Sequence, residues 1–262
     1  MELKRVVVTG LGALTPLGNN VPDFWQGLVA GKNGVGMITH FNTEGYKTKF
    51  ACELKDFNVL DFMDEKNARK LDPCAHYAYA AGVEALRDSG IDMDAVDRDR
   101  AGAIVASGIG GIQSAQDGIS EFAVSGKNPR FSPFFILRAL VNMPPAILSI
   151  RLGLQGPNYA LSSACASAAN AIVDGVPLPC DKLIVIVVDR EGDAKGAGVH
   201  SVCARCVGDA CVLLFVIRVH ISNVNRLGRP VVAPDIAKRN GNLFGKDAEG
   251  LGNRGGHVVV VA

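Results

Sequence analysis

Short apolar runs alternate with helix-like segments along most of the chain. The strand-like runs are residues 6–8, 101–111 (which ends in a glycine turn), 158–164, 183–188, 212–217 and 258–261. The main helical segments are residues 23–34, residues 67–90, and residues 133–153 on both sides of an irregularity at Pro144 and Pro145. Strands that alternate with helices predict an α/β fold, with a mostly parallel mixed sheet covered by helices on both faces.

Composition narrows the class of protein. Of 262 residues, 48% are hydrophobic and 20% charged, which is typical of a compact chain and not of a disordered one. The net charge of +1 argues against a dominant surface for nucleic acid or anionic membrane. The longest apolar runs, such as residues 183–188, are far too short to span a bilayer. We expect neither nucleic acid nor a membrane as a partner.

The cysteines and the first residues predict the compartment. Seven cysteines, an odd number, do not resemble the disulfide framework of a secreted domain. The chain opens with a charged start that runs directly into a strand, so we expect no signal peptide. Both features favour a cytoplasmic protein.

The character of the sequence changes near Gly175. Up to that point turns and strands follow in an orderly way, whereas the later part is richer in valine, arginine and cysteine. Residues 226–256 have the character of a long loop. We therefore treat residues 1–175 and residues 176–262 as two stretches of one unit.

One cysteine has a suggestive position. The stretch LSSACASAANAI, residues 161–172, places Cys165 between a strand-like run and a helix of small residues. A nucleophilic cysteine reacts as its thiolate, which the unpaired N–H groups at the start of a helix favour. Its own N–H can be one donor of an oxyanion hole. The alternative is a packed cysteine that acts as a small hydrophobic residue.

Four motifs in order carry a family resemblance. RVVVTGLGALTPLG (residues 5–18), ASGIGGIQ (106–113), RFSPFFI (130–136) and SIRLGLQGPNYALSSACASAANAI (149–172) together resemble the β-ketoacyl-acyl-carrier-protein synthases of fatty-acid synthesis, most closely the type II elongating enzymes. The resemblance implies a thiolase-like layered fold, of which residues 1–262 are the N-terminal half and the C-terminal half is absent. It also implies that such a half leaves an apolar helical face uncovered.

The resemblance implies an acyltransferase reaction without a cofactor. Cys165 would take an acyl group from acyl-carrier protein and condense it with a malonyl thioester, and the family works as a homodimer. The family's two catalytic histidines and its lysine belong to the second half. Histidines 40, 76, 200, 220 and 257 match neither histidine motif convincingly. We expect this chain to accept an acyl group without condensing it efficiently. The alternative is a non-catalytic relative that binds acyl-carrier protein or pairs with a full-length partner.

Further residues take expected roles from the resemblance. Ile109, with Gly110 beside it, resembles the position that lines the acyl pocket, although a buried isoleucine at a strand end is an equally good interpretation. Phe134 and Phe135 would line the same pocket or a dimer contact, and adjacent aromatic residues are also common in cores. The later part of the chain departs from the family pattern at Gly245 and Arg254.

A basic run precedes the long helix. Lys66, Arg69 and Lys70 suit a docking patch for an acidic carrier protein, and a solvated helix start is the alternative.

The sequence gives little support for a metal site or a dinucleotide-binding site. His200, Cys203, Cys206 and Cys211 contain one Cys-x-x-Cys pair but no second well-spaced pair, so we expect no metal. The glycines after the strands at residues 6–8 and 101–111 do not complete a dinucleotide-binding motif.

Overall fold

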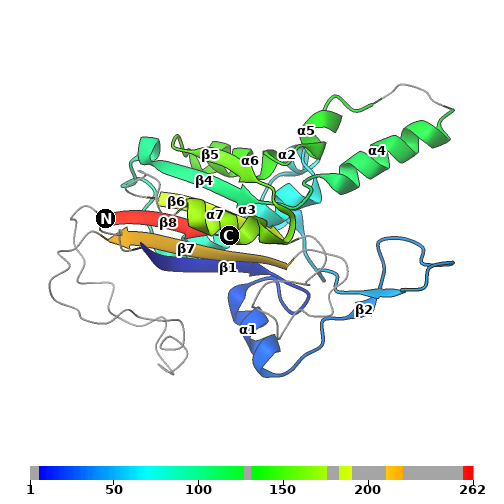
Figure 1. Cartoon of the computed structure of the whole chain (residues 1–262), viewed down its shortest axis with the longest axis horizontal. Helices are drawn as coiled ribbons and strands as arrows, with labels where there is room; N and C mark the ends of the chain where they lie inside the picture. The colour runs from blue at the N-terminus through cyan, green and yellow to red at the C-terminus, as the bar shows by residue number, and fades with distance from the viewer. Residues whose placement is uncertain (1–5, 127–130, 176–182, 191–210, 221–255, 262) are drawn as a thin grey trace.

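Figure 1 shows the computed structural model of the chain, which describes residues 6–126, 131–175, 183–190, 211–220 and 256–261. Its centre is a six-stranded sheet with the order β1-β7-β8-β6-β4-β5. The strands are β1 (Val6–Leu14), β4 (Ala101–Ala106), β5 (Asn158–Leu161), β6 (Leu183–Arg190), β7 (Cys211–His220) and β8 (Gly256–Val261). Four strands, β8, β6, β4 and β5, run parallel to one another, and β7 pairs antiparallel with β1 and β8. The predicted mixed sheet is present.

Helices lie on both faces of the sheet. Helix α3 (Pro73–Ser89) and α6 (Met143–Leu152) share a buried core with alternate residues of β4, namely Ala101, Ala103 and Val105. Ile104 is equally buried but lies outside that cluster, so it points to the other face. Helix α7 (Ser167–Gly175) contacts β4, β5 and β6 and lies in front of the sheet in Figure 1. The predicted two-sided covering is confirmed.

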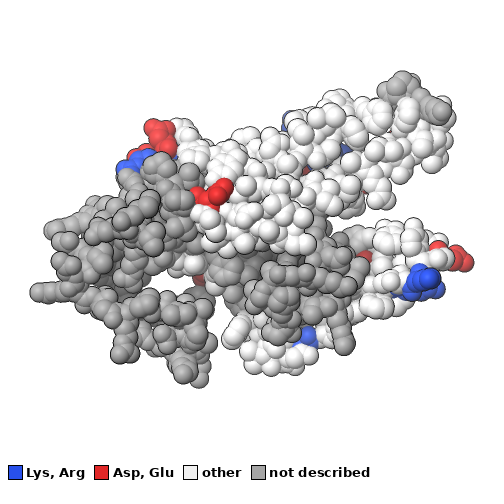
Figure 2. Space-filling view, in the orientation of Figure 1, with Lys and Arg blue, Asp and Glu red and all other residues white. Residues whose placement is uncertain are grey.

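The face that carries α7 has little charge. Figure 2 shows a mostly uncharged described surface in this view. Val173 on α7 has 64% of its surface exposed. The uncovered apolar helical face that the resemblance implies for the N-terminal half of a two-half fold remains a prediction, which the exposure of Val173 supports.

Strand β1 is longer than the sequence predicts. We expected a strand over residues 6–8 and then a loop, because glycines usually interrupt strands. Instead the strand continues to Leu14, and α3 packs against it. A Cβ atom on Gly10 would lie 2.2 Å from the carbonyl oxygen of Ala85, and one on Gly12 would lie 2.2 Å from that of Ala81. The glycines here allow close packing of helix and strand.

Two predicted helical segments have different boundaries. Residues 67–90 are divided into α2 (Glu65–Ala68) and α3, because Asp72, which precedes Pro73, is extended and caps α3. The second segment consists of α5 (Phe135–Ala139) and α6. The break comes before Pro144 and Pro145, which lie in the first turn of α6. Proline has no backbone N–H, and in the first turn of a helix that group would have no intrahelical acceptor.

The remaining elements lie around this frame. They are α1 (Val21–Val29), the short pair β2 (Gly36–Met37) and β3 (Phe50–Ala51), α4 (Ile112–Val124), and the 3₁₀ turns η1 (Val59–Asp61), η2 (Arg98–Arg100) and η3 (Ala164–Ala166). Helix α1 covers most of the segment predicted over residues 23–34. In the part of the chain that the structure describes, every helix is too short or too polar to cross a bilayer.

Glu84 on α3 joins β1 to α1. Its carboxylate accepts hydrogen bonds from the N–H groups of Ala13 and Val21, each at 2.8 Å. Burial raises the pKa of Glu84 despite these two bonds. Because the folded pKa exceeds the unfolded one, the folded chain holds this proton more tightly. The contribution of Glu84 to stability is therefore complete below the unfolded pKa and is lost as pH rises through the folded pKa.

We expect Glu84→Gln to remove this pH dependence. Urea titrations from pH 4 to pH 7 measure the unfolding free energies of the wild type and the variant. The unfolding free energy of the wild type should fall relative to that of the variant as pH rises. Glu44→Gln, which removes an exposed carboxylate, is the matched control for the loss of a negative charge. A Glu84→Gln difference that is flat, or that moves in the other direction, would contradict the assignment.

Candidate active site

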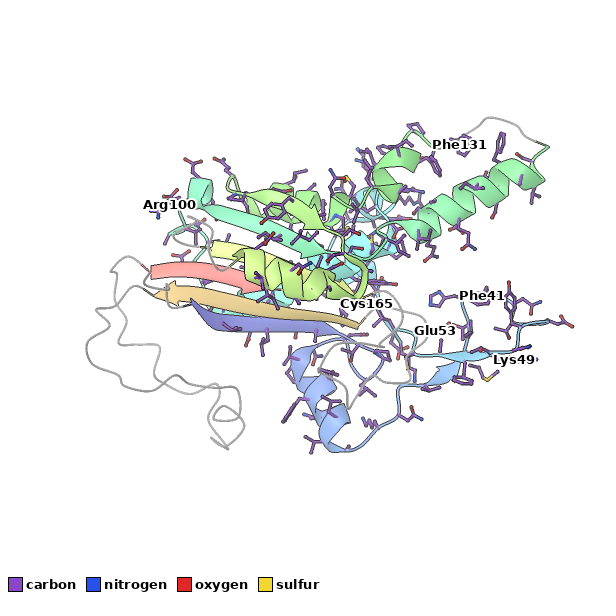
Figure 3. The ribbon with its side chains drawn as sticks, viewed as in Figure 1. Phe41, Lys49, Glu53, Arg100, Phe131 and Cys165 are labelled. Carbon is purple, nitrogen blue, oxygen red and sulfur yellow. The ribbon has the colours of Figure 1, made fainter. Side chains whose placement is uncertain are left out.

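Cys165 lies where the chain leaves the parallel part of the sheet. Strands β4 and β5 pair in parallel up to Ala106 and Leu161, so both chains leave at the same edge. After β5 the chain enters η3, which contains Cys165, and α7 begins two residues later. Figure 3 labels Cys165 beside α7. The Cys165 side chain is exposed, whereas Cys52 and Cys74 are buried. The prediction of an accessible thiol at a strand-to-helix turn agrees with this position.

The turn at Cys165 is tight and strained. Ala164 has a φ of 51°, in the left-handed region that non-glycine residues rarely adopt. Two short hydrogen bonds close it: the N–H of Ser163 donates to Oγ of Ser167 at 2.7 Å, and that hydroxyl donates to the carbonyl of Ala164 at 2.7 Å. Asn170 donates to Oγ of Ser163, also at 2.7 Å. Strain of this kind persists only where neighbours enforce it, and it is common at functional sites.

Sequence reasoning missed these supporting hydroxyl and amide groups. Ser163, Ser167 and Asn170 are spaced by four and three residues, which places them on one side of the start of α7. That spacing was visible in the sequence, but we considered the small residues only as a means of letting the backbone turn.

A glycine turn lies beside the Cys165 turn. The hydroxyl of Ser162 donates to the carbonyl of Gly108 at 2.9 Å, which joins the two turns directly. The buried hydroxyl of Ser107 accepts the N–H of Gly110 at 3.0 Å. Gly110 has a φ of 82°, and a Cβ atom there would lie 2.8 Å from Cα of Val141. Gly110 is therefore required by the backbone, and its predicted role at the substrate remains a prediction.

Ile109 is displayed by this glycine turn. Its side chain is 59% exposed, so it is not the buried strand-end residue that the alternative interpretation required. Its position next to the segment bonded to Ser162 places it near the Cys165 turn. A role in lining an acyl pocket remains a prediction.

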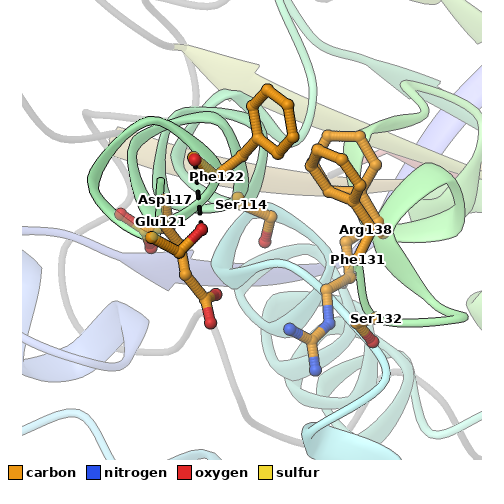
Figure 4. A pocket seen from close by; sticks show the side chains of 10 residues that line it. Ser114, Asp117, Glu121, Phe122, Phe131, Ser132 and Arg138 are labelled. Carbon is orange, nitrogen blue, oxygen red and sulfur yellow. Dashed lines mark hydrogen bonds between the residues drawn. The ribbon is translucent and has the colours of Figure 1, made fainter. Parts of the chain in front are cut away.

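Phe134 and Phe135 have different neighbours. The Phe135 ring lies 4.9 Å from that of Phe131, which stacks on Phe122 at 5.4 Å. These rings line a groove of about 210 Å³ between α4 and α5, seen in Figure 4, and Cys165 is not part of its lining. The amine nitrogen of Lys70 instead lies over the ring of Phe134, 5.8 Å from the centre of that ring. The structure thus does not place both rings at one site.

The predicted basic patch lies around α2. Lys66 and Arg69 are exposed, and Lys70 is half-buried. Arg69 forms an ion pair with Glu65 one turn earlier in the chain, and the amine of Lys70 donates to Asn67 at 3.4 Å. The three cationic groups are close in sequence, and Lys70 extends the patch toward α5 through Phe134.

Four of the five histidines, and one of the three cysteines of the zinc candidate, lie within the described residues. His76 is half-buried, its Nε2 lies 2.9 Å from the carbonyl oxygen of Ala68, and burial lowers its pKa. His220 and His257 lie in the paired strands β7 and β8. His200, Cys203 and Cys206 lie outside the described residues, and Cys211 begins β7. Within the described ranges, His, Cys, Asp and Glu form no cluster of three or more suited to a metal ion.

The sequence matches a known family over most of its length. Residues 3–176 match the family described as beta-ketoacyl synthase, N-terminal domain. The chain belongs to this family. Relatives include proteins named 3-oxoacyl-[acyl-carrier-protein] synthase 2 from Synechocystis sp. (40% identical, 68% of this chain and 42% of the relative) and from Vibrio cholerae (43% identical, 66% and 41%). The chain thus spans about four-tenths of the length of the curated relatives that it matches.

Solved structures agree on the fold. A beta-ketoacyl synthase from Burkholderia phymatum matches with a TM-score of 0.63 at 21% identity, over 83% of this chain and 59% of its own. A type II polyketide synthase ketosynthase in complex with its acyl-carrier protein matches with a TM-score of 0.59 at 21% identity, over 81% of this chain and 63% of its own. The expected thiolase-like N-terminal fold is confirmed, while the division of the chain at residue 175 remains a prediction.

Proposed function

We propose that this chain provides the acyl-accepting part of a β-ketoacyl-acyl-carrier-protein synthase of fatty-acid elongation, with Cys165 as the nucleophile. The observation that carries the proposal is the exposed Cys165 thiol in a strained turn that is bonded to the glycine turn after β4. Membership of the family supports it, as do the printed names of the relatives.

The proposed reaction is a transfer between two thioesters. The Cys165 sulfur attacks the carbonyl carbon of an acyl group on the phosphopantetheine arm of a carrier protein. A new carbon–sulfur bond forms, the old one breaks, and the phosphopantetheine leaves as a thiol after taking a proton. Backbone N–H groups of the turn, including that of Cys165, stabilise the negative oxygen of the intermediate. The strained turn holds the sulfur outside the packing, where a bulky thioester can reach it.

Condensation needs groups that this sequence does not offer. Decarboxylation of a malonyl thioester requires stabilisation of the resulting enolate, which the family assigns to two histidines of its second half. We propose that the chain accepts an acyl group but does not condense it efficiently alone. The partners are then acyl-carrier protein and its acyl and malonyl thioesters, and a homodimer is the proposed assembly.

Mass spectrometry tests this function. The chain is incubated with a fatty-acyl-carrier protein, and the mass of intact protein and of its peptides is followed. We expect one acyl group on the peptide that contains Cys165 and no steady ketoacyl product after malonyl-carrier protein is added. Absence of the adduct would refute acyl acceptance, and carrier binding without an adduct would favour a non-catalytic, carrier-binding relative. Sustained ketoacyl formation would refute the proposed lack of condensation.

Charge reversal tests the docking patch separately. Changing Lys66, Arg69 and Lys70 to glutamate should weaken carrier binding about tenfold or more at low salt and flatten its salt dependence, since such charges raise association rates. Transfer from a small acyl-pantetheine, which has no carrier to dock, should fall much less than transfer from the carrier. The matched control reverses the exposed lysines 32, 47 and 49. Equal salt dependence for both triple variants and the wild type would dismiss the patch.

A further inference from the structure

Asp72 is a buried carboxylate that joins two helices. Its side chain has only 3% of its surface exposed. One oxygen accepts the N–H of Cys74 at 3.0 Å and so caps α3. The other accepts the N–H of Ser114 at 2.9 Å, in the first turn of α4 and 42 residues away in sequence. A single carboxylate thus serves the N-termini of both helices, where a negative charge is favoured.

Helix α4 depends on this carboxylate for its cap. Its N-cap residue is Gly111, which has no side chain that could accept a hydrogen bond. The first N–H groups of a helix lack intrahelical partners, and a buried one is costly to leave unbonded. Asp72 supplies from another helix the acceptor that α4 lacks in its own sequence.

The start of α4 is continuous with the glycine turn beside Cys165. On one side Ser107 and Ser162 hold that turn to the ends of β4 and β5. On the other side it lies against the last turn of α5, so closely that a Cβ atom on Gly111 would lie 1.8 Å from the carbonyl oxygen of Arg138. Any shift of the first turn of α4 must therefore displace the glycine turn, including Ile109.

The segment between α2 and α3, which contains Asp72, also contacts the start of α5. Lys70, two residues before Asp72, lies over the ring of Phe134 at 5.8 Å. The chain between α2 and α3 thus contacts the α4–α5 unit at two points, one a charge-assisted hydrogen bond and one a cation–π contact.

We propose that Asp72 is a positioning residue for acyl transfer: through Ser114 it fixes the first turn of α4, and thereby holds the glycine turn and Ile109 in place beside Cys165. This inference rests on the proposed function. It gives the segment that follows α2 a role in shaping the acyl site in addition to its proposed contact with the carrier.

Asp72→Ser separates the two bonds of this carboxylate. Serine is a good N-cap, so its hydroxyl can still accept the N–H of Cys74, but it is too short to reach Ser114 as well. Asp64→Ser is the matched control: Asp64 caps α2 by accepting the N–H of Asn67 at 3.0 Å, and its described hydrogen bonds do not reach α4.

Amide hydrogen exchange tests the structural part without any assay of activity. In the Asp72→Ser variant of this chain, we expect exchange over residues 107–116 to be about tenfold or more faster than in the wild type, because a bond to a charged acceptor is lost. Exchange in α3 should be unchanged, and Asp64→Ser should leave residues 107–116 unaffected. Unchanged exchange over residues 107–116 in Asp72→Ser would overturn the proposal.

Alkylation of Cys165 tests the positioning part. Two reagents are compared by peptide mass spectrometry: iodoacetamide, and an iodoacetamide with a dodecyl chain that needs the acyl site. In Asp72→Ser we expect the dodecyl reagent to react about tenfold more slowly, since small displacements in a site have such effects, while iodoacetamide is nearly unaffected. Equal changes with both reagents would indicate a merely structural role and overturn the proposal. If the wild type itself accepts no acyl group, the proposed function fails, and hydrogen exchange still decides the role of Asp72.

Discussion

Cys165→Ala is expected to abolish acylation of the chain by a fatty-acyl-carrier protein. The reaction forms a bond to the Cys165 sulfur, and no neighbouring group in the turn can replace it, because serine hydroxyls are far weaker nucleophiles without an activating base. Intact-mass spectrometry after incubation should show complete loss of the adduct, a decrease of at least about a thousandfold in the rate of transfer. Carrier binding should be retained, because the proposed docking patch lies around α2.

A buried cysteine provides the control. Cys52 directly follows β3 and has 3% of its surface exposed, so Cys52→Ala removes a thiol that solvent does not reach. This variant should be acylated at nearly the wild-type rate. An adduct that persists in Cys165→Ala, or that disappears in Cys52→Ala, would show that the nucleophile is a residue other than Cys165 and refute the proposed function.

Gly12→Ala should strongly destabilise the fold. The added methyl group would lie 2.2 Å from the carbonyl oxygen of Ala81, a backbone atom that cannot rotate away. Strand β1 and α3 would have to separate, which we expect to lower the unfolding free energy by about 3 kcal/mol. A urea titration followed by circular dichroism measures this loss.

Gly36→Ala is the corresponding control. Gly36 is also a strand residue, in β2, but apart from its chain neighbours no heavy atom of the described residues lies within 4 Å of the place that its Cβ would take. The substitution should change stability by no more than about 0.5 kcal/mol. Similar losses for both variants would show that the effect comes from the lost glycine flexibility and not from close packing of α3 on β1.

The sequence predicts the elements of this fold better than their ends. Apolar runs mark all six strands of the sheet, because buried strands need such residues whatever their neighbours. The end of β1 could not be predicted: Gly10 and Gly12 resemble a loop until α3 is seen to pack on them. Likewise Pro144 and Pro145 indicate an irregularity in the helix. Only the observed start of α6 at Met143 shows that both prolines lie in its first turn, where a helix tolerates them.

At the candidate site the sequence identifies the thiol but not its support. Cys165 is found from its small neighbours and the family motif, since both are local. The bond between Asp72 and Ser114 joins residues far apart in sequence, so no local pattern reveals it. The exposure of Ile109 could not be predicted either. It depends on the conformation of the glycine turn, which no pattern in the sequence reveals.

The strand order has a consequence for synthesis on the ribosome. Strand β1 pairs with β7, with Val6 opposite Val219, so the first strand made cannot be completed until more than 200 further residues have been added. Contacts of such sequence separation form slowly. Until β7 emerges, β1 lacks the strand that it pairs with in the described sheet, and nascent chains with unpaired strand edges are prone to aggregate.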